Sequence, residues 1–184
     1  MILPIVLYGS PILKRVAKSI EKDYEGLGSL IEDMYETMET SDGVGLAAPQ
    51  IGKSIRLFVI DATPYEDDDP SVKGFKKAFI NPDIYERRGE NELFNEGCLS
   101  LPGIREDVSR PQEIKMRYYD ENFDLHDEAF NGIKARIIQH EYDHLEGILF
   151  PDRLQPLKRR LLNGKLNSIT KGKVDVAYRV KIAK

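Results

Sequence analysis

The sequence contains only one cysteine, Cys98, in 184 residues, so an internal disulfide is excluded. The first ten residues lack both a basic start and an unbroken apolar core, which argues against a secretion signal. No apolar run approaches the roughly 20 residues that a membrane-spanning helix needs. We therefore expect a cytoplasmic protein without a membrane span. The length predicts a single domain over residues 1–184, which buries about 70% of the surface of its unfolded chain.

A strong charge of either sign is also lacking. The formal net charge is -4, which gives no indication of DNA binding. Acidic residues are concentrated at 66–69, whereas the segment after Gln155 is rich in lysine and arginine and has one acidic residue, Asp175. A basic tail can contact RNA, but a solvated surface that keeps a protein soluble has the same pattern.

Two amphipathic helices are predicted from hydrophobic periodicity. Apolar residues at 27–38 recur at helical spacing opposite acidic ones, and the turn-forming residues 41–43 should end this helix. A second helix is predicted over residues 132–146, where Asn131 can cap the start and Gly147 can form the end.

Strands are predicted where apolar and polar residues alternate. Three segments follow this pattern: 113–119, 123–127 and 174–183. Two further strands are predicted from β-branched and apolar residues, at 55–60 and at 79–85. The strand at 79–85 is interrupted by Asn81-Pro82, and the segments 113–119 and 123–127 predict a hairpin in which His126 faces solvent. Residues 61–71 predict an exposed acidic loop, and residues 157–166 a short basic helix.

The second predicted helix carries the densest group of potential metal ligands. His140 and His144 are four residues apart, so a helix places both imidazoles on one face, where they can bind one metal ion. In such His-Glu-x-x-His (HExxH) sites the carboxylate, here Glu141, is the general base toward a water whose pKa the metal lowers from about 15.7 to roughly 7. Ile133 and Ile137 share that face and predict an apolar floor. The alternative is a polar helix with this spacing by chance.

A catalytic metal of this kind needs a third protein ligand and one open position. No histidine follows His144 and no glutamate follows Glu146, which excludes the downstream ligand of common His-Glu-x-x-His proteases. Only Asp152 and Asp175 remain on that side. Cys98 is the stronger candidate because a thiolate is a soft, strongly donating ligand. For a lone cysteine the alternative is a buried apolar side chain.

A run of small residues at 43–50 follows the first predicted helix. Its two glycines suggest phosphate binding, but the third glycine of the dinucleotide fingerprint is absent, which argues against nucleotide binding. Small residues also let another molecule approach the backbone closely. We therefore interpret residues 43–50 as a substrate-lining loop rather than a plain tight turn.

Three segments together resemble the three signature motifs of the peptide deformylases: residues 43–50, 96–100 and 139–144. The match is complete in each, and a looser resemblance extends over residues 7–154. The resemblance implies an α+β fold with antiparallel sheets packed around a central metal-binding helix. It also implies a hydrolase of protein biosynthesis that removes formate from the N-formylmethionine of new polypeptides.

Carried over to this sequence, the resemblance implies roles for individual residues. The metal ligands would be Cys98, His140 and His144. Glu141 would be the catalytic carboxylate, while Gln50 and the backbone N–H of Leu99 would stabilise the oxygen that becomes negative. An ion pair between Glu96 and Arg110 would brace the cysteine loop.

The resemblance also implies how the peptide binds. The backbone of Val44 and Gly45 would pair with the substrate as an extended strand. Ile133 and Ile137 would form walls for the methionine side chain, and Arg105 would contact the peptide.

The implied cofactor is one divalent metal ion, with Fe²⁺ expected in the cell and Zn²⁺, Ni²⁺ or Co²⁺ able to occupy the same site. The implied partners are nascent formyl-Met polypeptides and the ribosome, contacted through the basic C-terminal tail. The sequence departs from the family after Leu154, where a closing strand replaces the long C-terminal helix that many bacterial members use for docking.

Two other functions are alternatives to the deformylase interpretation. A metallopeptidase of another type would cleave unformylated peptides and tolerate the loss of Cys98. A structural or sensory metal module would have a closed fourth position, but such a site needs no substrate edge, and residues 43–50 argue against it.

Overall fold

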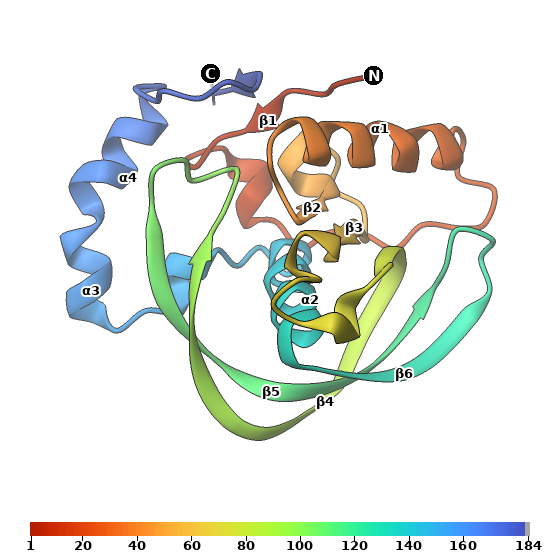
Figure 1. Cartoon of the computed structure of the whole chain (residues 1–184). Helices are drawn as coiled ribbons and strands as arrows, with labels where there is room; N and C mark the ends of the chain where they lie inside the picture. Colours follow the sequence, from red (N-terminus) through yellow and green to blue (C-terminus); the bar gives the residue numbers. More distant parts are fainter. Residues whose placement is uncertain (183–184) are drawn as a thin grey trace.

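A curved five-stranded sheet surrounds one central helix in the computed structural model, which describes residues 1–182 (Figure 1). The strands are β1 Ile5–Val6, β2 Gly45–Ala47, β3 Leu57–Asp61, β4 Lys76–Gly97, β5 Arg105–Tyr119, β6 Leu125–Asn131 and β7 Val180–Lys181. The α-helices are α1 Leu27–Thr40, α2 Gly132–Leu145, α3 Pro156–Leu161 and α4 Asn163–Thr170. Short 3-10 helices are η1 Pro11–Lys14, η2 Ala48–Ile51, η3 Thr63–Tyr65, η4 Pro70–Val72 and η5 Phe150–Arg153.

The main sheet has the order β2-β3-β4-β5-β6, and all its neighbouring strands are antiparallel. In Figure 1, β4 and β5 curve beneath α2, while α1 lies above β2 and β3. A separate pair joins β1 and β7 in parallel, so both ends of the described chain meet on one side. The predicted α+β fold with antiparallel strands around a central helix is confirmed.

Apolar side chains explain why α2 occupies the centre. Ala135, Ile138 and Leu145 are fully buried and pack with the aromatic residues of the sheet, among them Phe79 and Tyr118. A second cluster lies between α1 and the strands β2 and β3. Burying such side chains stabilises the fold by roughly 25 cal/mol for each Å² of apolar surface. The first of these clusters holds α2 against the sheet.

Both predicted long helices are confirmed, although one capping prediction is wrong. Asn131 occupies the N-cap position of α2, but its side chain accepts no capping hydrogen bond. Gly147 follows the end of α2 with a φ of 71°, in the left-handed region that glycine tolerates. None of the helices within residues 1–182 is long and apolar enough to cross a membrane.

The predicted hairpin is confirmed as β5 and β6, but β4 is longer than the sequence indicates. Asn81-Pro82 does not interrupt it, because the register shifts between Ile80 and Asp83 and Asn81 takes a positive φ of 49°. Such a bulge absorbs a residue that cannot donate a ladder hydrogen bond. His126 in β6 is partly solvent-facing, as predicted: its side chain is 34% exposed, while its ring stacks on Tyr118 and its Nε2 lies 2.7 Å from Asp120 Oδ2.

The C-terminal predictions are only partly right. The basic segment forms two helices, α3 and α4, instead of one. The predicted strand at 174–183 is reduced to two residues, because its only strand partner within the described chain, β1, is itself two residues long. Residues 174, 176, 178 and 180 nevertheless alternate in burial with their neighbours, while residue 183 lies outside the described residues.

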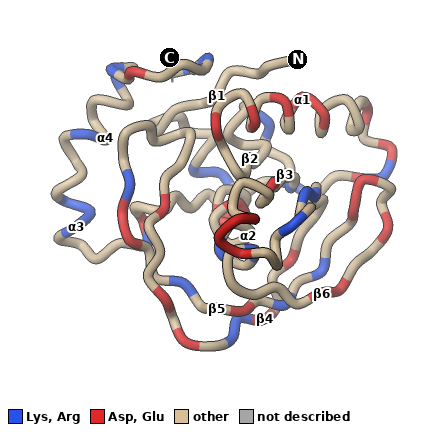
Figure 2. Tube along the Cα trace, in the orientation of Figure 1, with Lys and Arg blue, Asp and Glu red and all other residues tan. Residues whose placement is uncertain are grey.

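Charge is distributed unevenly over this fold (Figure 2). The basic residues of α3 and α4 lie at one end of the molecule, whereas the acidic residues of α1 lie toward the other end. The predicted acidic loop is largely exposed at 66–68, but Val72 in η4 is fully buried. The loop is therefore anchored to the core at its end.

Candidate metal centre

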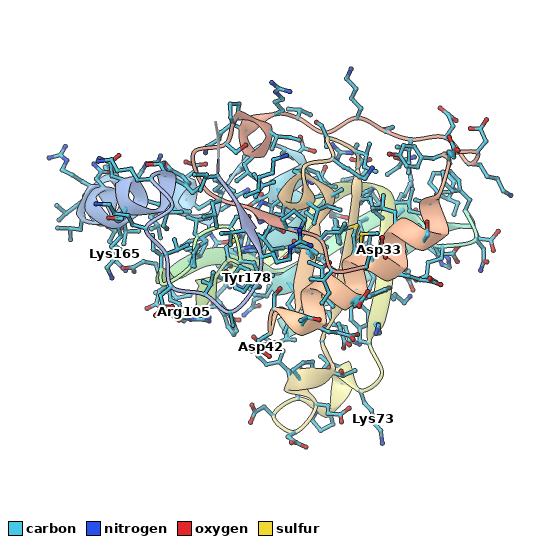
Figure 3. The ribbon with its side chains drawn as sticks, turned by 90° about the horizontal axis from the view of Figure 1, so that it is seen from above. Asp33, Asp42, Lys73, Arg105, Lys165 and Tyr178 are labelled. Atoms are coloured by element: carbon cyan, nitrogen blue, oxygen red, sulfur yellow. The ribbon has the colours of Figure 1, made fainter. Side chains whose placement is uncertain are left out.

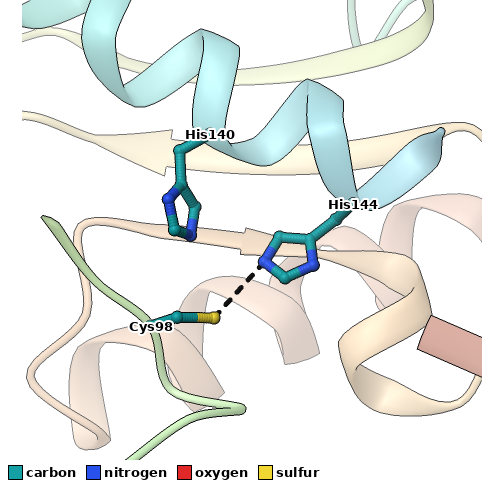
Figure 4. Close-up of side chains that lie close together, drawn as sticks. All are labelled: Cys98, His140 and His144. Atoms are coloured by element: carbon teal, nitrogen blue, oxygen red, sulfur yellow. Dashed lines mark hydrogen bonds between the residues drawn. The ribbon is translucent and has the colours of Figure 1, made fainter. Parts of the chain in front are cut away.

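Three side chains from two parts of the chain converge beside α2 (Figure 4). Cys98 follows the last residue of β4, and His140 and His144 lie one turn apart on α2. One ligand atom from each lies within 4.8 Å of the others, and Cys98 Sγ is 3.4 Å from His144 Nε2. Tetrahedral bonds of about 2.0–2.3 Å to one ion place neighbouring donor atoms roughly 3.3–3.6 Å apart, which the Cys98–His144 distance matches. The donor types, one thiol and two imidazoles, fit a divalent metal.

A buried carboxylate fixes the orientation of the first histidine. Glu96 Oε2 lies 2.9 Å from His140 Nδ1, so the other ring nitrogen is directed toward Cys98 and His144. Arg110 donates to both oxygens of Glu96 at 2.6 and 2.9 Å, which confirms the predicted ion pair. Burial alone would raise the pKa of Glu96, but hydrogen bonds from Arg110 and His140 outweigh it and hold the pKa well below its usual range.

The ion pair extends into a buried network that the sequence analysis missed. Arg110 Nη1 donates to Asp143 Oδ2 at 2.8 Å, and Arg153 donates to both oxygens of Asp143 at 2.5 Å. Arg136 Nη1 donates to Glu96 Oε1 at 3.2 Å. Asp143 and Arg136 lie on α2. Their position on the helix that carries the predicted metal ligands is the sequence signal that could have indicated a role in this network. Such charges are stable in the interior only because they are paired.

The two histidines differ in protonation. Burial lowers the pKa of His144 well below its ordinary value, so this imidazole is neutral, as a metal ligand must be. Burial alone would also lower the pKa of His140, but hydrogen bonds to Cys98 and Glu96 raise it well above the ordinary value. Metal binding at this site therefore displaces a proton.

Glu141 is buried and lies against the backbone of β2. Its side chain is 4% exposed, and burial raises the pKa of its carboxyl to about 7. Its Oε2 has no hydrogen-bond partner in the described part of the chain. A Cβ atom on Gly45 would lie 2.3 Å from Glu141 Oε1, so only glycine fits here. A carboxyl with such a pKa can exchange protons at neutral pH.

Gln50 presents its amide group to the same place. Its Oε1 accepts a hydrogen bond from the Ala47 backbone N–H at 2.9 Å, which directs the Nε2 group inward. Nε2 lies 3.5 Å from Cys98 Sγ and 3.2 Å from Ser100 Oγ. The side chain is 1% exposed, so its orientation is fixed by the surrounding residues.

A cavity of about 430 Å³ opens onto these groups. Most of the residues singled out from the sequence line it: Val44, Gly45, Gln50, Cys98, Leu99, Arg105, Ile137, His140 and Glu141. Ile133 does not, because it packs against the core one turn earlier on α2. Tyr65 in η3 and Tyr178 from the C-terminal segment also line the cavity, although no sequence pattern pointed to them.

The floor and edge of the cavity are suited to an extended peptide. β2 is an edge strand, and only β3 pairs with it in the described part of the chain. Opposite it, Arg105 donates from Nε to Asn95 Oδ1 at 2.8 Å and from Nη2 to Asn95 O at 2.9 Å. An edge strand offers backbone N–H and C=O groups to which a peptide can add as a further strand.

Known proteins are similar to this chain in sequence and in fold. The family model described as polypeptide deformylase matches residues 2–160. The peptide deformylase of Christiangramia forsetii is 50% identical over 98% of this chain and 96% of its own, and that of Flavobacterium johnsoniae is 51% identical over 100% and 97%. A crystal structure of a peptide deformylase from Legionella pneumophila has a TM-score of 0.81 at 36% identity, covering 94% of this chain and 98% of its own. The chain belongs to the peptide deformylase family.

Proposed function

We propose that this chain removes the formyl group from the N-terminal formylmethionine of newly made polypeptides and releases formate. The observation that carries the proposal is the convergence of Cys98, His140 and His144 beside the buried Glu141. Family membership over nearly the whole chain supports the same activity. Residues 1–184 are proposed to form one catalytic domain, supported by the pairing of β1 with β7.

The proposed metal ligands are Cys98, His140 and His144. A divalent ion held there would supply Lewis acidity for the hydrolysis of an amide. We propose Fe²⁺ as the ion in the cell, with Zn²⁺, Ni²⁺ and Co²⁺ as substitutes. The mixed sulfur and nitrogen donor set is compatible with all four.

Glu141 is the proposed general base and acid. It takes a proton from the attacking water, the water oxygen forms a bond to the formyl carbon, and the carbon–nitrogen bond then breaks. The same carboxyl delivers its proton to the departing amine. Its pKa of about 7 supports both transfers, because a group titrating near the working pH can accept and return a proton.

Gln50 and Leu99 are the proposed donors to the formyl oxygen as it becomes negative. The inward-facing Nε2 of Gln50 and the backbone N–H of Leu99 belong to residues that line the cavity next to Cys98. Donors that are fixed before the reaction stabilise the transition state without reorganisation, and removing one costs about 10²–10³ in rate in other hydrolases.

The peptide is proposed to bind along the edge of β2. The backbone of Val44 and Gly45 pairs with it, and Ile137 contacts the methionine side chain. Ile133 stays a proposed wall, but its packing against the core leaves it a supporting role behind Ile137. Arg105, held by Asn95, is proposed to contact the peptide beyond methionine.

The proposed partners are nascent formylated polypeptides and, in the cytoplasm, the ribosome. The support for the second partner is the basic end of the molecule, where α3 carries Lys158, Arg159 and Arg160 with none of its residues buried. Lysine and arginine side chains bind phosphates in a salt-dependent way. Cosedimentation with ribosomes that weakens as salt is raised would support this contact.

The test of the activity is formate release from a formyl-Met peptide by protein purified without oxygen. We expect turnover by the wild type and a loss of about 10²–10⁴-fold in Glu141→Gln, with metal content unchanged, since general base catalysis contributes about that much. An inactive wild type that binds Fe²⁺, Ni²⁺ or Co²⁺ would overturn the deformylase activity in favour of a structural metal module. Cleavage of unformylated peptides would indicate a metallopeptidase.

A further inference from the structure

The C-terminal segment reaches the proposed active site from outside the family signature motifs. After α4 the chain continues as an extended segment whose side chains at 174, 176, 178 and 180 are partly buried. Val176 and Tyr178 line the same cavity as Cys98 and Glu141. Seen from above, Tyr178 lies close to Arg105 and Asp42, two other residues of the cavity lining (Figure 3).

One hydrogen bond joins this segment to the cysteine loop. The Tyr178 hydroxyl donates to the backbone carbonyl of Leu99 at 2.8 Å, across 79 residues of sequence. Burial, and to a smaller extent the nearby Cys98, raises the pKa of Tyr178 to about 12. The phenol therefore stays protonated and can donate this hydrogen bond. The Tyr178 ring also packs against the apolar cluster between α1 and the sheet.

The segment is itself held in place by β1. Ile5 N–H donates to Arg179 O at 2.8 Å, and Leu7 N–H donates to Lys181 O at 2.9 Å. The residue after Leu7 then contacts the cysteine loop directly, because Tyr8 N–H donates to Ser100 O at 2.9 Å. The carbonyls of Leu99 and Ser100 are thus held from outside by two segments that are paired with each other.

We propose that Tyr178 is a positioning residue of the active site, which acts by holding the Leu99 carbonyl. This inference rests on the proposed function, in which the Leu99 backbone N–H donates to the formyl oxygen. The Leu99 carbonyl lies in the peptide plane after Leu99 and its N–H in the plane before it. Fixing the first plane limits the φ and ψ rotations of Leu99 through which the second plane, and with it the N–H, could turn. An oxyanion donor contributes most when its direction is set before the reaction.

The test compares Tyr178→Phe with Tyr85→Phe. Phenylalanine keeps the ring that packs against the core and removes only the hydroxyl. Tyr85 is a matched control because its hydroxyl also makes a hydrogen bond, to Asp127 Oδ1 at 2.6 Å, but it does not line the cavity. In Tyr178→Phe we expect kcat for a formyl-Met peptide to fall about fivefold, the effect of one neutral hydrogen bond. KM should change less than about twofold, and Tyr85→Phe should match the wild type.

A second measurement does not depend on activity. Amide hydrogen exchange of a peptide covering residues 98–101 should be faster in Tyr178→Phe than in the wild type, and unchanged in Tyr85→Phe. Unchanged exchange together with unchanged kcat would overturn the inference, as would a rise in KM alone. If the wild type releases no formate, the proposed function fails, while the exchange rates still decide whether Tyr178 orders the loop.

Discussion

The helices α2 and α3 differ in which residues they bury: α2 buries charged as well as apolar side chains, and α3 buries neither. In α2, Arg136, Glu141 and Asp143 are each less than 8% exposed, whereas α3 buries no residue and leaves Leu157 and Leu161 68% and 76% exposed. Burying a charge costs free energy unless the charge is paired. Even paired, buried charged residues stabilise a fold no more than apolar residues of similar volume would. We propose that α2 keeps Arg136 and Asp143 because they belong to the buried network around Glu96, which contacts the proposed metal ligand His140.

The largest expected effect on stability comes from removing Arg110 of β5, which pairs with Asp143 of α2. Arg110→Met leaves Glu96 and Asp143 without a main partner, and we expect a loss of about 3–5 kcal/mol in the free energy of unfolding. Arg160→Met on the exposed α3 should change it by less than about 0.5 kcal/mol. Urea unfolding of metal-free protein measures both. Equal losses of unfolding free energy in the two variants would contradict this expectation, because they would mean that the buried charges do not need their partner.

A smaller effect should come from substituting Gly45 in β2, which contacts Glu141 of α2, with the exposed Gly28 of α1 as the control. Gly45→Ala would place a Cβ atom against Glu141, and we expect formate release to fall about 10²-fold, as for a displaced catalytic group. Gly28→Ala in the exposed first turn of α1 meets no atom within 4 Å. It should leave the rate unchanged and stabilise the fold by about 0.5 kcal/mol. Full activity of Gly45→Ala would contradict the contact with Glu141.

The smallest effect should come from an ion pair near α3 and should depend on pH. Burial alone would raise the pKa of Asp152, but hydrogen bonds from Lys14, the Leu149 N–H and Arg159 lower it. A lowered pKa stabilises the folded state above the unfolded value and loses that contribution as the pH falls through the folded value. The thermal midpoint of the wild type should therefore exceed that of Asp152→Asn at pH 6, by a margin that shrinks in acid.

The exposed Asp67 provides the control for this measurement. Asp67→Asn should follow the wild type at every pH. A stability difference between the wild type and Asp152→Asn that grows as the pH falls would have the wrong sign and would contradict the assignment.

Local sequence patterns predicted the parts of the molecule that local forces determine. The spacing of His140 and His144 and the turn residues around α1 and α2 required no knowledge of distant segments. Cys98 was found because downstream ligands were absent, and the glycines near Val44 because small residues permit close approach. These features follow from helix geometry and ligand chemistry.

Features that depend on distant contacts were missed. Asn81-Pro82 has the character of a turn, yet pairing with β5 keeps β4 continuous through a bulge. Ile133 shares a helix face with His140, but periodicity does not reveal where the cavity ends. Alternation in the C-terminal segment predicted which residues are buried, but it did not reveal that Tyr178 contacts Leu99.

The pairing of β1 with β7 has a consequence for synthesis of the protein. Ile5 is synthesised long before its partner Val180, because α1, the five strands of the main sheet and α2 lie between them in the chain. Domains begin to fold from the N-terminus during translation, and contacts between distant segments form late. The Leu99 carbonyl therefore acquires its tyrosine partner only after β4, β5 and α2 have all been synthesised, so the cysteine loop gains this contact later than its contacts with α2.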